Sequence, residues 1–108
     1  MNYKIELTDN FKKEAKKLIK KYASLRIEIK TLGEELSKNP TLGIPLGNNV
    51  YKIRLAISSK AKGKSGGARV ISFVKIINET VYLISIYSKG EKDSISDKEI
   101  KELLKEYL

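Results

Sequence analysis

The sequence predicts a small α+β domain in which an antiparallel sheet packs against helices. Three observations support this prediction. The chain has 108 residues, a length typical of one domain. Apolar residues recur with helical spacing in some segments and with strand-like patterns in others. Hydrophobic residues make up 41% of the chain, which excludes a disordered basic tail. We therefore expect one domain over residues 1–108, with the element order β-α-α-β-β-β-α.

The N-terminal part predicts a strand followed by a helical hairpin. Residues 2–7 alternate between polar and apolar, as in a half-buried strand. Thr8, Asp9 and Asn10 offer helix N-caps, and Ser24 offers the N-cap of a second helix. Pro40 ends the second helix. The apolar stripes of the two helices are Phe11, Ala15, Leu18, Ile19 and Tyr22, then Leu25, Ile29, Leu32 and Leu36.

The C-terminal part predicts three strands and a final helix. Residues 40–49 are rich in Pro, Gly and Asn and are expected to form a loop. Residues 50–57 alternate, whereas 68–77 and 80–87 are apolar on both faces, as central strands are. A basic, Gly-rich loop is expected at 58–67. Ser96 and Glu99 predict a capping box, and the last helix carries the stripe Ile100, Leu103, Leu104 and Tyr107.

The composition excludes several kinds of chemistry. The chain has no Cys and no His, so disulfides, thiol nucleophiles, Cys zinc sites and His-based acid–base catalysis are ruled out. We expect no metal and no cofactor. No apolar run approaches the ~20 residues of a membrane span, and residues 1–6 do not resemble a signal peptide. A cytoplasmic protein is the expectation.

The positive charge is concentrated in the middle of the chain. The sequence has 22 Lys+Arg and 13 Asp+Glu, a net charge of +9. No Asp or Glu occurs from residue 36 to residue 78, and this stretch holds Lys38, Lys52, Arg54, Lys60, Lys62, Lys64, Arg69 and Lys75. A field of one sign predicts a polyanionic partner, most simply nucleic acid. A solvated basic face is the alternative.

Four cations are candidates for a catalytic cluster. Lys52 and Arg54 are two residues apart on a strand and share a face. Arg69 opens the next strand and Lys89 follows the last one, so hairpin pairing would gather all four on one sheet face. A hydrophobic core does not explain them, because unpaired charges are not buried. A solvated sheet face remains the alternative explanation.

If RNA binds there, cleavage requires a base for the 2′-OH, charge stabilisation at phosphorus and an acid for the 5′-oxygen. A lysine among other cations has a lowered pKa, so Lys52 is the candidate base. Arg54 and Arg69 suit the phosphate oxygens. The acid is left open among Lys89, Arg69 and Tyr87. Residues predicted to contact RNA or the ribosome are Lys60, Lys62, Lys64, Lys75 and Tyr87.

Three segments together resemble the RelE/ParE superfamily of bacterial toxins, most closely its HigB-like branch. They are YKIRL (51–55), GKSGGARVI (63–71) and YLISIYSK (82–89). The resemblance implies the toxin of a type II toxin–antitoxin pair that cleaves mRNA on the ribosome without a metal. It also implies a cognate antitoxin as partner, with operator DNA bound only through the toxin–antitoxin complex.

The resemblance also suggests roles for individual residues. Lys52 and Arg54 match the paired basic positions, Arg69 matches the arginine that contacts the scissile phosphate, and Lys89 stands where RelE has an active-site arginine. The catalytic tyrosine of RelE has no counterpart, because that region reads DSI at 93–95. Two alternatives stay open: a ParE-like inhibitor of DNA gyrase and a non-catalytic RNA- or ribosome-binding module.

Overall fold

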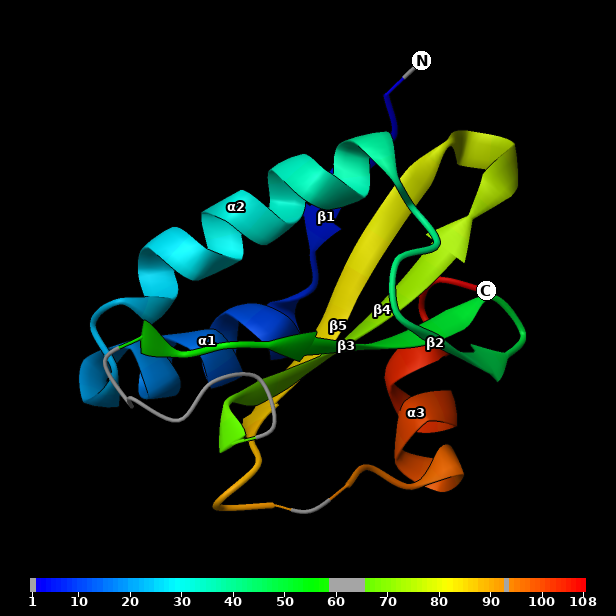
Figure 1. Ribbon diagram of the computed structural model, residues 1–108. Coiled ribbons are helices and arrows are strands. Elements are labelled where there is room, and N and C mark those ends of the chain that lie inside the picture. Colours follow the sequence, from blue (N-terminus) through cyan, green and yellow to red (C-terminus); the bar gives the residue numbers. More distant parts are fainter. Residues whose placement is uncertain (1, 59–65, 93) are drawn as a thin grey trace.

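The computed structural model describes residues 2–58, 66–92 and 94–108. Within these residues, five strands form one sheet in the order β1-β5-β4-β3-β2, with α1 and α2 on one face and α3 on the other (Figure 1). β1 pairs with β5 in parallel, and the other pairs are antiparallel. The α+β prediction is confirmed. The elements are β1 (Lys4–Leu7), α1 (Asp9–Lys21), α2 (Leu25–Lys38), β2 (Ile44–Gly47), β3 (Val50–Leu55), β4 (Ala68–Lys75), a 3-10 turn (Ile76–Asn78), β5 (Thr80–Ser88) and α3 (Asp97–Leu104).

The strand β2 is the main correction to the predicted order, because residues 40–49 were expected to be a loop. Ile44 pairs with Lys52, and a turn with positive φ at Asn48 (54°) and Asn49 (65°) leads directly into β3. Asn tolerates this left-handed conformation and favours tight hairpins. All four residues of β2 are exposed, and the alternation of Ile44 and Leu46 is too short, and too interrupted by Pro45 and Gly47, to predict a strand.

The first hydrophobic core lies between the helical hairpin and the sheet. Phe11 and Leu18 of α1 and Leu32 of α2 are buried there against residues of β3, β4 and β5. The predicted cap of α1 is confirmed, since the N–H of Phe11 donates to Oγ1 of Thr8 at 3.2 Å. The predicted N-cap position of α2 is confirmed at Ser24, but the side chain does not cap the helix. Ser24 has helical backbone angles, and its hydroxyl donates to Glu28 at 3.2 Å.

The second core lies under α3 on the opposite face of the sheet. Ile100 and Leu104 pack there against Val50, Ile71, Phe73 and Ile84. The predicted capping box is confirmed: the N–H of Glu99 donates to Oγ of Ser96 at 3.1 Å, and the N–H of Ser96 donates to Oε1 of Glu99 at 3.4 Å. The pairing of β3 with β4 continues past these core residues to Arg54 and Arg69. These two arginines are not part of the core that α3 covers.

Glu14 of α1 binds the C-terminal half of β5, which includes Tyr87. The β4–β5 register shifts after Ile71, so that β5 carries one extra residue. There Oε1 of Glu14 accepts from Oγ of Ser85 at 2.8 Å, from the N–H of Ile86 at 3.3 Å and from the amide of Asn10 at 2.8 Å. These bonds stabilise the irregular strand, since the bulge leaves backbone groups outside the ladder.

Candidate active site

A row of three side chains crosses the sheet on the face that also carries α3. Arg54 of β3 is the direct partner of Arg69 of β4, and Arg69 is in turn the direct partner of Tyr87 of β5. Directly opposed residues have Cβ atoms about 4.5–5.5 Å apart. The three side chains therefore lie side by side across the sheet.

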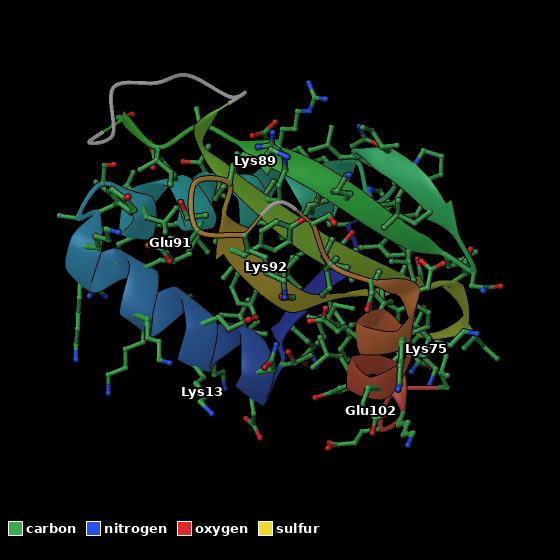
Figure 2. All side chains as sticks on the ribbon, turned by 90° about the horizontal axis from the view of Figure 1, so that it is seen from below. Lys13, Lys75, Lys89, Glu91, Lys92 and Glu102 are labelled. Atoms are coloured by element: carbon green, nitrogen blue, oxygen red, sulfur yellow. The ribbon has the colours of Figure 1, made fainter. Side chains whose placement is uncertain are left out.

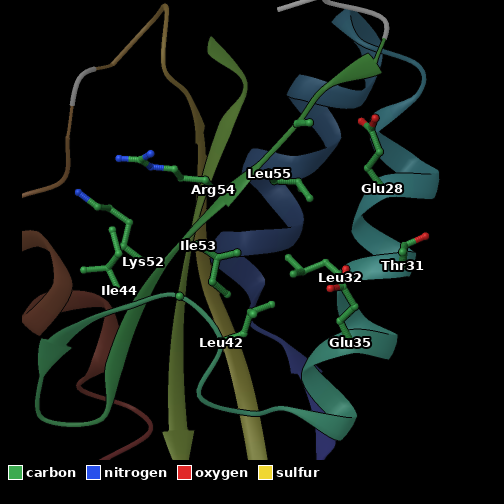
Figure 3. Close-up of a pocket in the computed structure, with 12 residues that line it drawn as sticks. Glu28, Thr31, Leu32, Glu35, Leu42, Ile44, Lys52, Ile53, Arg54 and Leu55 are labelled. Carbon is green, nitrogen blue, oxygen red and sulfur yellow. The ribbon is translucent and has the colours of Figure 1, made fainter. Parts of the chain in front are cut away.

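Lys52 lies beside this row on β3. It pairs with Ile71 of the α3-side core and lies two residues from Arg54, which corresponds to roughly 7 Å along a strand. Figure 3 shows the side chains of Lys52 and Arg54 pointing to the same side, away from Ile53 and Leu55. The structure thus brings Lys52, Arg54 and Arg69 to one face, as the sequence predicted.

The three cations differ in burial. Arg54 is exposed and Lys52 is half-buried, whereas Arg69 is only 6% exposed and donates from Nη1 to the carbonyl of Ala68 at 3.1 Å. Like charges directly opposite on neighbouring strands repel each other. An anion between Arg54 and Arg69 would remove this repulsion, and guanidinium groups bind phosphate oxygens in a forked geometry.

Tyr87 contributes a buried hydroxyl at the end of the row. The side chain is 6% exposed, and its Oη has no hydrogen-bond partner within the described residues. Burial raises the pKa of the phenol, while the charges of Arg69 and Lys92 oppose this shift more weakly. Tyr87 is therefore a neutral phenol at neutral pH, able to donate a proton or a hydrogen bond.

The sequence did not reveal Lys92 as a neighbour of this row. Its Nζ lies 5.7 Å from the centre of the Tyr87 ring, and it pairs with Glu99 of α3 at 2.8 Å. The position of Lys92 depends on the turn after β5, where its N–H donates to the carbonyl of Ser88 at 3.0 Å. The capping box placed Glu99 correctly, but nothing in the sequence links Glu99 to Lys92.

Lys89 and Lys75 lie near opposite ends of β4. Lys89 directly follows β5, and its N–H donates to the carbonyl of Gly67 at 3.0 Å, close to the start of β4 (Figure 2). Lys75 lies six residues beyond Arg69, about 20 Å along β4, and its Nζ donates to the carbonyl of Tyr107 at 3.2 Å. The structure does not bring Lys75 to the cluster. Lys60, Lys62 and Lys64 lie outside the described residues.

A hollow borders β3 on the side that faces α2. It has a volume of about 610 Å³ and lies between α2 and β3, on the side of the sheet away from the side chains of Lys52 and Arg54 (Figure 3). Its lining combines apolar residues such as Leu32 and Leu42 with the carboxylates of Glu28 and Glu35. Lys52 and Arg54 border the same hollow, although their side chains point away from α2 (Figure 3). Glu28 is further engaged by Ser58, whose N–H donates to it at 2.7 Å.

Among the described residues, no group of three or more Asp and Glu side chains is placed to hold a metal ion. None of the described helices combines the length and the apolar character needed to cross a membrane.

The arrangement of sheet and helices is that of the RelE-like toxins. A free variant of the E. coli toxin RelE superposes with a TM-score of 0.67 at 22% identity, covering 100% of both chains. The toxin of the intact E. coli RelBE toxin–antitoxin complex gives 0.61 at 22% identity, covering 80% of this chain and 95% of that one. The RelBE2 toxin–antitoxin complex from Mycobacterium tuberculosis gives 0.57 at 16% identity, covering 82% and 99%.

The sequence establishes the family. The model of the family described as "RelE toxin of RelE / RelB toxin-antitoxin system" matches residues 3–107. The protein belongs to this family and is a type II toxin of the RelE/ParE superfamily.

Proposed function

We propose that this toxin is a ribosome-dependent mRNA endoribonuclease that inhibits translation. The observation that carries the proposal is the row Arg54–Arg69–Tyr87, set by strand register, with Lys52 beside it on the same face. A solvated basic face explains an exposed Arg54. It does not explain why Arg69, which is only 6% exposed, lies directly opposite a second arginine. Two guanidinium groups side by side suit the oxygens of a phosphate bound between them.

The proposed reaction divides the three chemical roles among these residues. Lys52 takes the proton from the 2′-OH, whose oxygen then attacks the adjacent phosphorus. Arg54 and Arg69 stabilise the negative charge that develops on the phosphate oxygens. The proton for the leaving 5′-oxygen comes from Lys89 or Tyr87, because an arginine does not release its proton in proteins. The cations supply the charge stabilisation, so this mechanism uses no metal.

The same proposal defines the partners. The family membership and the RelBE complexes to which this fold is similar support a cognate antitoxin, with operator DNA bound through the toxin–antitoxin complex. Lys60, Lys62 and Lys64 supply further contacts to RNA or the ribosome, whereas Lys75 contacts the carbonyl of Tyr107 at the other end of β4 and is left out of the site. A ribosomal substrate implies action in the cytoplasm. The Gly- and Lys-rich segment before β4 supports a place in the HigB-like branch.

Primer extension on a defined mRNA in a purified translation system tests the proposal. We expect cleavage only when ribosomes are present, and loss of cleavage in an Arg69→Ala variant that still folds. Full cleavage by Arg69→Ala would contradict the assigned role of this residue. Cleavage of naked RNA would remove the ribosome dependence. Absence of cleavage by folded protein would favour a gyrase inhibitor, detectable as DNA damage on expression, or a non-catalytic RNA-binding module.

A further inference from the structure

Lys92 connects the row of site residues to α3. Its Nζ lies over the ring of Tyr87, 5.7 Å from the ring centre, and donates to Oε2 of Glu99 at 2.8 Å. The other oxygen of the same carboxylate, Oε1, closes the capping box with Ser96. One glutamate therefore both caps α3 and holds a lysine beside Tyr87.

The hydroxyl of Tyr87 is the group next to Lys92 that could bind a ligand. It is buried and has no hydrogen-bond partner among the described residues. A buried polar group without a partner destabilises the folded protein, and such groups are rare in folded proteins. Tyr87 is the direct cross-strand partner of Arg69, so a phosphate bound at Arg69 would lie next to this hydroxyl. A phosphate oxygen would then supply the missing acceptor.

The surroundings of Lys92 allow its side chain to leave Glu99 for another partner. It lines two separate hollows of about 360 Å³ and 260 Å³, the first shared with Glu99 and Ile95 and the second with Tyr87 and Ser88. The side chains of Lys92 and Glu99 are 37% and 50% exposed. Exposed ion pairs contribute little net stability. Breaking the pair with Glu99 therefore costs little free energy, and a phosphate can compete with Glu99 for Lys92.

We propose that Lys92 is a phosphate-binding residue of the RNA site, which Glu99 holds in the free protein and which moves to the phosphate bound by Arg54 and Arg69. In the same complex, the hydroxyl of Tyr87 donates a hydrogen bond to that phosphate. The proposal deepens the function proposed above and rests on it, since it assumes that the row binds RNA phosphate.

Binding of a fluorescein-labelled, 12-nucleotide single-stranded RNA, measured over a range of salt concentrations, tests this proposal. We expect Lys92→Gln to weaken binding about tenfold, as loss of a charge-assisted hydrogen bond does. It should also reduce the salt slope by about 0.7, the value for one phosphate contact on a single strand. The matched control is Lys101→Gln, which removes the same charge from exposed α3 and should change neither quantity to this extent.

Glu99→Gln separates release of Lys92 from loss of the helix cap, because glutamine also serves in a capping box. Freed from its ion pair, Lys92 should bind the RNA roughly two- to fivefold more tightly. Glu102→Gln is the matched control. It removes the same charge from α3, but Glu102 pairs with Lys105 at 3.1 Å. An equal gain in both variants would show a general charge effect and overturn the proposed role of Glu99.

Tyr87→Phe tests the hydroxyl. We expect cleavage of ribosome-bound mRNA to fall about tenfold while the urea midpoint is not lowered, since the hydroxyl has no partner to lose. Unchanged binding in Lys92→Gln, or unchanged cleavage in Tyr87→Phe, would overturn the inference if Arg54→Gln still weakens RNA binding. If Arg54→Gln has no effect, or the unmodified protein does not bind the RNA, the proposed site itself fails and the inference with it.

Discussion

Arg54 and Arg69 face each other as direct cross-strand partners in the antiparallel pair of β3 and β4. A sheet selected for stability alone would place opposite charges, or an apolar pair, at such positions, because opposed like charges destabilise the pair. The second arginine is also almost fully buried. The proposed function accounts for this pair, because two adjacent guanidinium groups can bind the oxygens of one phosphate.

Arg54→Gln should raise stability and lower activity. Removing the exposed member of the pair relieves the repulsion, so we expect the free energy of unfolding to rise by about 0.2–1 kcal/mol in urea titrations. Loss of one preorganised charge should lower cleavage of ribosome-bound mRNA by about 10²–10³-fold.

Lys75→Gln serves as the control for this prediction. It removes a positive charge at the other end of β4, where Lys75 contacts the carbonyl of Tyr107, and we expect cleavage to fall by less than about threefold. An Arg54→Gln variant that is less stable than the unmodified protein would show that Arg54 has a structural partner rather than a binding role.

The sequence predicts the cation row because strand periodicity alone fixes which side chains share a face. Lys52 and Arg54 are two residues apart, and the pairing of neighbouring strands brings Arg69 to them. Lys92 and β2 could not be predicted in this way. The place of Lys92 depends on a turn and on a carboxylate of α3, and β2 is a four-residue, exposed edge strand that contains Pro and Gly. Tertiary contacts decide both, and periodicity carries no information about them.

Glu14 should be a main stabilising residue of the sheet. Its Oε1 accepts hydrogen bonds from Asn10, Ser85 and Ile86 where β5 departs from regular pairing. Truncation in Glu14→Ala removes this acceptor from Ser85 and Ile86, while Asn10 keeps its bond to the carbonyl of Ile84 at 2.9 Å. We expect the free energy of unfolding to fall by about 2–3 kcal/mol in urea titrations.

Glu102→Ala is the comparison for Glu14, since it removes a carboxylate whose only described pair is an exposed one with Lys105. Its effect should stay within about 0.5 kcal/mol. Equal losses in the two variants would mean that Glu14 does not stabilise the irregular part of β5.

The contact between Glu99 and Lys92 predicts a pH dependence. The hydrogen bond from Lys92 is the main cause of a lowered pKa of the Glu99 carboxyl, and its bonds with Ser96 add to the effect. Because the folded-state pKa lies below the unfolded value of about 4.3, the stabilisation is present above that value and is lost as the pH falls through the folded-state pKa.

Urea titrations from pH 7 to pH 3 check this dependence. The unmodified protein should be the more stable of the two at pH 7, and the difference from Glu99→Gln should shrink as the solution is acidified below about pH 4. A difference that stays constant over this range would show that the ionised carboxylate of Glu99 does not stabilise the folded protein.

Two glycines should respond to alanine in opposite directions. Gly33 lies inside α2, and a Cβ added there meets no atom within 4 Å, so Gly33→Ala should raise stability by about 0.5–1 kcal/mol. A Cβ on Gly67 would lie 2.3 Å from the carbonyl oxygen of Leu55, and the backbone of β3 or β4 must move to admit it. Thermal unfolding of the two variants measures both effects.

Gly67→Ala should also damage the site beyond its effect on stability. Leu55 and Ala68 are the last paired residues of the hairpin, directly beside Arg54 and Arg69. A shift of the two strands at this point changes the separation of the arginines, so cleavage should fall at temperatures where the variant is still folded. The Gly33→Ala variant should cleave like the unmodified protein, because α2 packs on the opposite face of the sheet. Full activity of a folded Gly67→Ala variant would show that the spacing of Arg54 and Arg69 does not limit the reaction.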